Sequence, residues 1–202
     1  MGRRIALLVG ISEYGPGFNP LPSSERDIKA LGAVLRSPER GQFEVFELTN
    51  PDPQRLREAI EDVLVSAGRN DMVLLYYSGH AVKDARGRLF LASPQTRKTG
   101  DGELQQSTAV PSEFVHDCMD RSRCRHQVVI LDCCFSGAFA EGLSAKDDRT
   151  VDVKRHFGGE GRAVLTSSTS MQYSFEREGS ALSVYTRFLV EGIRSGAADL
   201  DC

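Results

Sequence analysis

Two stretches of the sequence end in side chains that can perform nucleophilic chemistry. In Val128 to Gly137 an apolar run leads into two adjacent cysteines, Cys133 and Cys134. In Asp71 to His80 an apolar run leads through small residues to one histidine. A cysteine thiolate is a strong nucleophile, and a neighbouring histidine can both favour the thiolate and protonate a leaving group. The residue types therefore indicate a Cys/His pair.

Both apolar runs are predicted to be neighbouring parallel strands. Each is continuous, as expected for a strand buried on both faces, and each gives way to polar residues suited to a tight turn. Parallel strands end together at one edge of a sheet, which is where α/β proteins place their ligand sites. We therefore expect His80 and a cysteine to meet at that edge, just after their strands.

The rest of the chain alternates strands and helices, which predicts an α/β fold of three layers. Its mostly parallel central sheet is expected to carry helices on both faces. Further strands are predicted over 4–11, 43–48 and 163–168, with a short hairpin strand within 86–94. Helices are predicted from Ser23 or Ser24 as the cap, after 50–53, over 111–119 and over 180–194; residues 95–107 are expected to form a surface loop.

Composition favours one domain. The 202 residues are 40% apolar, which suits a single core over 1–202, and the polar stretch at about 140–161 predicts a mobile loop. A net charge of −3 with mixed signs argues against nucleic acid or an anionic membrane as partners. Five cysteines make a poor disulfide framework, so we expect reduced thiols and a cytoplasmic location. The short apolar run 5–11 is interpreted as a core strand and not a signal peptide.

Two motifs resemble those of a known family. Tyr77-Ser-Gly-His80 and Asp132-Cys-Cys-Phe-Ser-Gly137 are similar to the His and Cys motifs of caspase-like cysteine peptidases, and most similar to the metacaspase and bacterial caspase-homologue branch. Fifty-four positions separate His80 from Cys134, close to the spacing of about 50 typical of caspases. The resemblance runs from the first strand to the helix over 180–194. It implies a caspase-like fold and a cysteine endopeptidase.

The resemblance also implies roles in catalysis. It makes Cys134 the nucleophile, His80 its partner and Cys133 a structural neighbour. The oxyanion hole would use the backbone N–H groups of Cys134 and of the residue after the histidine, which is usually glycine and here is Ala81. Alanine keeps the N–H but disfavours positive φ, so the local geometry must accommodate a Cβ.

An acidic pocket for the substrate side chain before the cut is implied as well. The motif positions that correspond to it are Ser24, Asp27, Ser78 and Asp132. Two carboxylates would bind Arg or Lys through charge-assisted hydrogen bonds, so the expected partner is a protein or peptide with a basic residue there. The alternative interpretations are that Asp27 decorates the first turn of a helix and that Asp132 caps a turn after its strand.

The predicted mobile loop contains two further groups of candidate residues. Members of the family are often cut after the nucleophile, so Arg149, Lys154 and Arg155 are candidate self-cleavage sites or, equally, solvated charges. Some metacaspases use calcium, and Asp147, Asp148 and Asp152 cluster without a recognisable ligand pattern, so calcium dependence stays open.

No other cofactor or metal is expected. The spacing of His116, Cys118, Cys124 and His126 matches no common zinc pattern. The chain stops at Cys202 without a terminating element, which suggests the N-terminal part of a longer protein with a regulatory domain after it. Two alternatives remain open: a caspase-like peptidase with non-basic preference, and a non-proteolytic scaffold, which the intact Cys and His disfavour.

Overall fold

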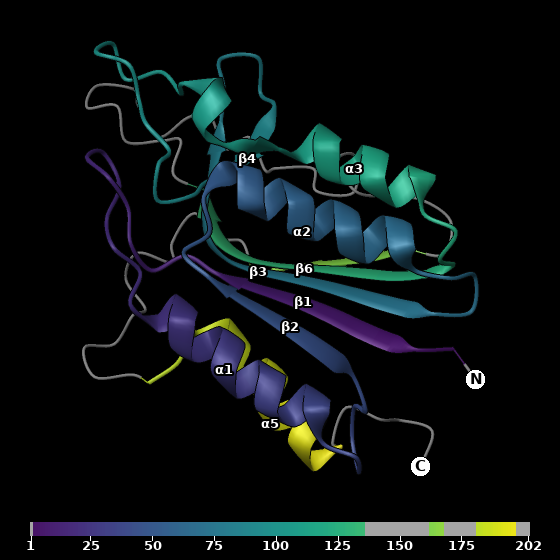
Figure 1. Ribbon diagram of the computed structural model, residues 1–202. Helices are drawn as coiled ribbons and strands as arrows, with labels where there is room; N and C mark the ends of the chain where they lie inside the picture. Colours follow the sequence, from purple (N-terminus) through teal and green to yellow (C-terminus); the bar gives the residue numbers. More distant parts are fainter. Residues whose placement is uncertain (1, 136–161, 168–180, 197–202) are drawn as a thin grey trace.

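A seven-stranded, mostly parallel sheet forms the centre of the molecule. The computed structural model describes residues 2–135, 162–167 and 181–196. Figure 1 shows helices on both faces of the sheet, with α1 and α5 below it and α2 and α3 above it. This arrangement confirms the predicted three-layer α/β fold.

The strands divide into a parallel part and a small antiparallel extension. In the parallel part the order is β2-β1-β3-β6-β7, and β4 and β5 continue from the far end of β3. The strands are β1 (Arg4–Gly10), β2 (Glu44–Thr49), β3 (Met72–Lys83), β4 (Leu89–Leu91), β5 (Val110–Pro111), β6 (His126–Phe135) and β7 (Arg162–Thr166). The hairpin strand expected within 86–94 is therefore β4, antiparallel to β3.

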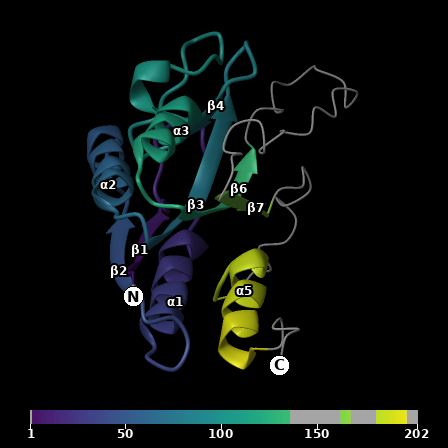
Figure 2. The same cartoon turned by 90° about the vertical axis from the view of Figure 1, so that its right-hand side faces the viewer.

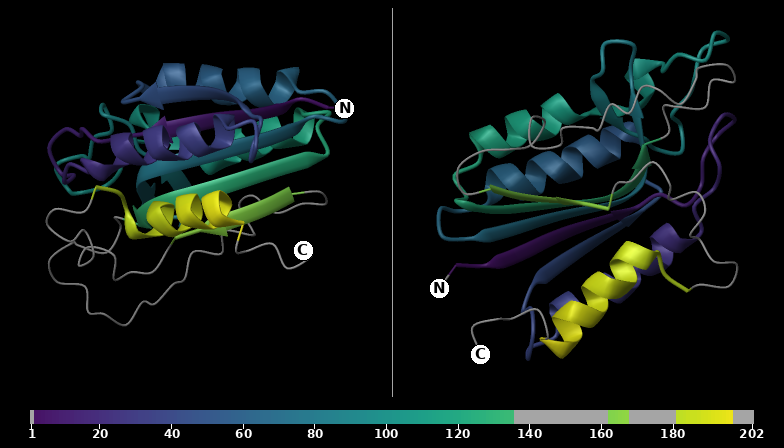
Figure 3. Two further views of the ribbon diagram at one scale, coloured as in Figure 1. Left: turned by 90° about the horizontal axis from the view of Figure 1, so that it is seen from below. Right: turned by 180° about the vertical axis from the view of Figure 1, so that it is seen from behind.

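Four α-helices complete the described layers. They are α1 (Ser23–Arg36), α2 (Pro53–Ser66), α3 (Ser112–Arg121) and α5 (Val184–Ser195), with a short 3₁₀ turn, η1 (Gln106–Thr108), in the predicted surface loop. The further views in Figures 2 and 3 show α1 and α5 side by side on the same face of the sheet. None of the helices that the structure describes is long and apolar enough to cross a membrane.

Each face of the sheet carries its own hydrophobic core. Successive strand residues point to opposite faces, so neighbouring residues of one strand enter different cores. Tyr76 packs with the α1 and α5 side, whereas Tyr77 packs with the α2 and α3 side. The predicted inward face of α1 is confirmed, because Ile28 and Leu31 are buried against the sheet.

The start of α1 differs from the prediction. Pro22 occupies the N-cap and makes no side-chain cap, while Ser23 and Ser24 lie inside the first turn and are buried. The reason is close packing on β1: a Cβ at Gly10 would lie 2.6 Å from the carbonyl oxygen of Ser24. Both serines are thus buried residues of the helix itself, and neither precedes it as a cap.

β3 and β6 are longer than predicted, and this changes the position of the candidate residues. The two strands pair in parallel without interruption from Met72 and His126 to Ala81 and Phe135. The polar residues expected to form turns, as far as Phe135, thus lie within the strands. Small size allows this at Gly79, where a Cβ would lie 2.7 Å from the hydroxyl of Tyr77. The prediction that the strands end before their reactive residues was wrong.

The C-terminal helix also begins later than predicted. α5 starts at Val184, and the Ser183 side chain caps it by accepting a hydrogen bond from the N–H of Thr186. Serine is among the favoured residues at this position, because its oxygen satisfies a backbone N–H that the helix leaves unpaired. The prediction of a helix over 180–194 therefore had the right element but the wrong first residue.

Candidate active site

His80 and Cys134 occupy adjacent strands at the same level. In the parallel register of β3 and β6, the Cα of His80 pairs with that of Cys134. Both positions lie near the carboxyl ends of their strands, on the sheet edge where the sequence predicted a Cys/His pair. The structure thus brings the two backbone positions together, inside the strands and not after them.

The imidazole of His80 is enclosed by the segment between β1 and α1. Its exposed fraction is 0%, and the rings of Tyr14 and Phe18 lie 4.6 and 5.6 Å from it between centroids. His80 Nε2 lies 2.8 Å from the carbonyl oxygen of Asn19. When Nε2 carries the proton it donates to Asn19, and Nδ1 is then the nitrogen that can act as a base.

The sequence named no group that orients the histidine, and Asn19 is that group. A backbone carbonyl exists at every residue, so no residue type marks it in a sequence. The Gly and Pro residues between β1 and α1 are typical of a loop and give no sign of a contact with His80. The contact arises because β1 and β3 pair side by side, which brings the segment after β1 next to the end of β3.

The backbone around His80 is held from two sides. The N–H of His80 donates to the hydroxyl of Tyr14 over 2.8 Å, and the hydroxyl of Tyr77 lies 2.8 Å from the carbonyl oxygen of His80. Burial raises the pKa of Tyr77 well above its ordinary value, so this hydroxyl stays protonated and can donate. Ala81, the candidate oxyanion donor, is buried in β3. Among the described residues other than glycine, only Gln42 and Asn50 have positive φ, so the backbone at Ala81 accommodates its Cβ.

Two buried carboxylates meet beside this edge. Asp27 of α1 is 0% exposed and Asp132 of β6 is 9% exposed. Ser183 links them, because its N–H donates to Asp27 Oδ1 over 2.9 Å and its hydroxyl donates to Asp132 Oδ2 over 2.5 Å. Asp27 therefore does not decorate a helical turn, and Asp132 does not cap one. The two aspartates form a common acidic centre on the α1 and α5 face of the sheet.

Burial dominates the electrostatics of this centre. Removal from water raises the pKa of Asp27 from 3.8 to about 7, and the charge of Asp132 adds to the increase. Hydrogen bonds from Ser183 and Ser78 act in the opposite direction. Desolvation also raises the pKa of Tyr76 well above its ordinary value. The tyrosine is thus a neutral neighbour of the two carboxyl groups.

Comparison with known proteins identifies the family. The family model described as a caspase domain matches residues 3–202 of the chain. The chain belongs to the caspase-domain family. Among solved structures, the crystal structure of protein GSU0716 from Geobacter sulfurreducens is similar, with 22% sequence identity and a TM-score of 0.49. The match covers 67% of this chain, and 52% of that protein, so this chain spans about half of its length. No curated protein matches the sequence.

The match to the caspase domain thus confirms the predicted family. The metacaspase branch stays a prediction. So do the roles of the individual residues, which follow from motif positions and from the geometry of the site.

The remaining predicted pocket positions of the caspase domain lie close to the acidic centre. Ser78 of β3 donates from its hydroxyl to Asp27 Oδ2 over 3.3 Å. Ser24 is buried three residues before Asp27 on α1, which puts both on one face of the helix. All four predicted pocket residues are thus found on α1, β3 and β6 at one end of the sheet.

The sequence missed the contribution of α5 to this part of the caspase domain. Thr186 is completely buried, and its hydroxyl donates to Asp132 Oδ2 over 2.9 Å. The hydroxyl of Tyr76 lies 2.5 Å from that of Thr186. The preference of helix N-caps for serine was the one local signal that could have indicated Ser183, and nothing in the sequence indicated its contact with residues far away in the chain.

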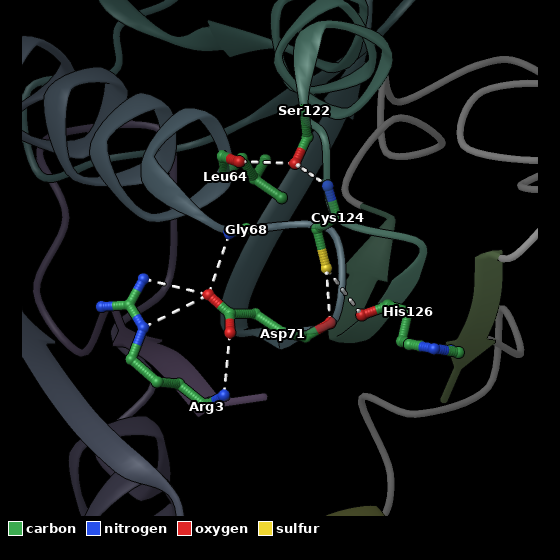
Figure 4. Close-up of polar contacts among 7 residues, drawn as sticks. All are labelled: Arg3, Leu64, Gly68, Asp71, Ser122, Cys124 and His126. Atoms are coloured by element: carbon green, nitrogen blue, oxygen red, sulfur yellow. Dashed lines mark hydrogen bonds and ion pairs between the residues drawn. The ribbon is translucent and has the colours of Figure 1, made fainter. Parts of the chain in front are cut away.

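Cys124 and His126, two of the four residues considered for zinc, lie away from the acidic centre. Figure 4 shows the opposite end of the sheet, where the thiol of Cys124 donates to the carbonyl oxygens of Asp71 and His126. The imidazole of His126 points away from that thiol in the same view. Within 2–135, 162–167 and 181–196, no three His, Cys, Asp or Glu side chains are grouped to hold a metal ion.

Some predicted residues lie outside the part of the chain that the structure describes. These are the candidate self-cleavage residues Arg149, Lys154 and Arg155, and the aspartates considered for calcium, Asp147, Asp148 and Asp152.

Proposed function

We propose that this caspase domain is a cysteine endopeptidase that cleaves after Arg or Lys, with Cys134 as the nucleophile and His80 as its acid and base. The observation that supports this most directly is the pairing of His80 with Cys134 across β3 and β6. The acidic centre on the same end of the sheet provides the reason to expect a basic substrate side chain.

The proposed reaction proceeds in two steps. The Cys134 thiolate attacks the scissile carbonyl carbon, and the imidazolium of His80 gives its proton to the leaving amine as the C–N bond breaks. His80 then takes a proton from water, whose oxygen attacks the thioester and releases the thiolate. The Asn19 carbonyl would keep the ring oriented throughout through Nε2. The backbone N–H groups of Ala81 and Cys134 are the proposed oxyanion donors.

The two adjacent cysteines belong to opposite faces of β6. Cys133 is 1% exposed and belongs to the core under α2 and α3. Because strand residues alternate between faces, position 134 belongs to the face that carries Asp132. This supports Cys134 as the nucleophile and Cys133 as a core residue.

The acidic centre supports a preference for basic residues. A guanidinium or ammonium group can offset part of the negative charge of two carboxylates that burial and mutual repulsion otherwise disfavour. A caspase-like peptidase with non-basic preference is the second candidate. It is favoured by the burial of Asp27, which raises the pKa of that carboxyl to about 7 and so reduces the negative charge available to a basic side chain at neutral pH.

Hydrolysis of fluorogenic peptides that differ only in the residue before the cut tests both candidates. The peptides carry Arg, Lys, Asp or Leu there, and each is measured with calcium and with a chelator. Arg and Lys peptides should be cleaved, and Cys134→Ala should remove the activity. Cys133→Ala is the matched control, because it deletes the neighbouring thiol and should retain activity.

Each outcome separates the alternatives. Cleavage after Asp or Leu alone would retain the peptidase and refute the basic pocket. No cleavage of any peptide by the wild-type protein would favour the scaffold alternative. Activity that survives Cys134→Ala but not Cys133→Ala would reverse the assignment of the nucleophile. The intact mass of the wild-type protein and of Cys134→Ala then tests whether self-cleavage occurs at Arg149, Lys154 or Arg155.

A further inference from the structure

The first turn of α5 is joined to both carboxylates of the acidic centre. Ser183 donates its N–H to Asp27 and its hydroxyl to Asp132, so one residue connects α1 with β6. Thr186, one turn later, donates a second hydroxyl to the same oxygen of Asp132. The hydroxyl of Tyr76 lies 2.5 Å from that of Thr186 and 3.4 Å from the same oxygen of Asp132, so it belongs to the same hydrogen-bonded cluster.

These contacts address the main difficulty of an acidic pocket. Two carboxylates in a buried site repel each other and lose hydration, so they tend to retain a proton. Donors that point at the carboxylate oxygens oppose this tendency, and the positive end of a helix dipole adds to their effect. The N-terminal turn of α5 supplies both kinds of stabilisation to Asp27 and Asp132.

Further contacts fix the position of the first turn of α5 next to the two carboxyl groups. The guanidinium of Arg26 donates from Nε to the carbonyl oxygen of Ala181 over 2.5 Å. The hydroxyl of Ser183 also accepts from the N–H of Thr186, which fixes the rotamer that reaches Asp132. Val190, two turns further along α5, is buried in the core below the sheet. The helix therefore presents its first turn to the carboxylates in one orientation.

We infer that Ser183 and Thr186 are positioning residues that determine specificity for a basic substrate side chain. They hold Asp27 and Asp132 in one fixed arrangement, so that a guanidinium meets two ordered carboxyl groups whose oxygens already accept hydrogen bonds. This inference rests on the proposed function, because it assumes that the acidic centre receives the residue before the cut. None of the recognised motifs includes α5. The inference adds this helix to the elements that determine substrate specificity.

The test compares Ser183→Ala and Thr186→Val with the wild-type protein on Arg peptides. Each variant removes one hydroxyl donor from Asp132 with little change in volume. Loss of a hydrogen bond to a charged group should raise KM about tenfold or more in each variant, with kcat nearly unchanged. Ser183→Thr restores the hydroxyl and should return KM close to the wild-type value.

Two controls separate positioning from simple support of the helix. Val190→Ala weakens the packing of α5 without touching a carboxylate, so it should lower Tm and leave KM unchanged. Ser195→Ala removes a hydroxyl at the far, exposed end of α5 and should change neither. If Val190→Ala raises KM as much as Thr186→Val at an equal loss of Tm, the positioning role is refuted.

A binding measurement keeps this result separate from the fate of the proposed function. Affinity for N-acetyl-arginine amide is measured by calorimetry for the wild-type protein and the variants, whether or not peptides are cleaved. Binding that weakens about tenfold in Ser183→Ala and Thr186→Val supports the inference even if the wild-type protein is not a peptidase. Equal binding by wild type and variants refutes the inference, as does a wild-type protein that neither cleaves Arg peptides nor binds the compound.

Discussion

At the scale of single residues, burying the carboxyl group of Asp27 lowers the free energy of unfolding at neutral pH. The side chain is completely buried and its pKa is about 7 instead of 3.8, chiefly because of desolvation. Between these two pH values the folded state holds a proton that the unfolded state has lost. The free energy of unfolding therefore decreases as pH rises from about 4 to about 7, by an amount on the order of a few kcal/mol.

Asp27→Asn should consequently stabilise the protein, and more so at high pH. Asparagine can still accept from the N–H of Ser183, but it has no charge to desolvate. We expect the gain in Tm over the wild-type protein to be larger at pH 8 than at pH 5. Hydrolysis of Arg peptides should fall in the same variant. Thermal denaturation at the two pH values measures the difference, and an equal gain at both would contradict the assigned pKa.

Tyr14 is the second residue with a specific expected effect. Its hydroxyl accepts from the N–H of His80 and its ring lies against the imidazole. Tyr14→Phe keeps the ring and removes the acceptor, so the histidine should lose part of its fixed orientation. We expect kcat to fall by about one order of magnitude with little change in KM. Steady-state kinetics on the best peptide tests this, and a change confined to KM would argue against an orienting role.

The residue types of the site were largely predictable, but their partners were not. Cys134, His80, Asp27 and Asp132 could be chosen from two motifs and their spacing. Asn19 could not, because it acts through a backbone carbonyl that every residue possesses. Ser183 was missed for a different reason: hydroxyl side chains are common, and what matters is a tertiary contact between distant segments.

At the scale of elements, sequence patterns predicted which helices and strands exist better than where they end. Apolar periodicity located α1 and α2, since a buried face must repeat along a helix. It did not show that β6 continues through Asp132 to Phe135, because polar residues in a strand resemble a turn when read alone. The continuation depends on pairing with β3, which is a tertiary interaction.

α2 offers a test of the independence of the two helical layers. The carboxylate of Asp52 caps this helix by accepting from the N–H of Arg55 over 2.7 Å. Asp52→Ala should reduce the free energy of unfolding by about 1 kcal/mol. Because α2 covers the face opposite the acidic centre (Figure 1), KM for Arg peptides should not change. Urea denaturation and kinetics on one preparation measure both, and a raised KM would show that the layers are coupled.

At the scale of the whole molecule, the His80 and Cys134 pair and the acidic centre differ in how they are assembled. His80 and Cys134 both belong to the continuous segment 2–135. The acidic centre needs this segment and also the segment 181–196, which contributes Ser183 and Thr186. The described segment 162–167 supplies β7, which pairs with β6 from Gln127 and Arg162 onward.

A single cut between β6 and β7 should therefore leave two fragments that stay associated. The strand pairing and the packing of α5 on α1 would hold them together. We expect a variant with an inserted recognition site for an unrelated protease within 140–150 to elute as one species after cleavage. Size-exclusion chromatography in native buffer and in urea checks this. Separation of the fragments in native buffer would show that these contacts are weaker than the covalent link.

The enclosure of His80 also determines how the site responds to chemical labelling. Reagents that acylate imidazoles modify the rings that they can reach from solvent. Of the three histidines that the structure describes, His126 is exposed, His116 is half-buried beside Asp120, and His80 lies beneath two aromatic rings. Such a reagent would mark His126 and His116 first and leave His80 unmodified in the folded protein. Resistance to a histidine reagent would thus be compatible with a catalytic histidine, and a covalent probe would have to be designed for the cysteine.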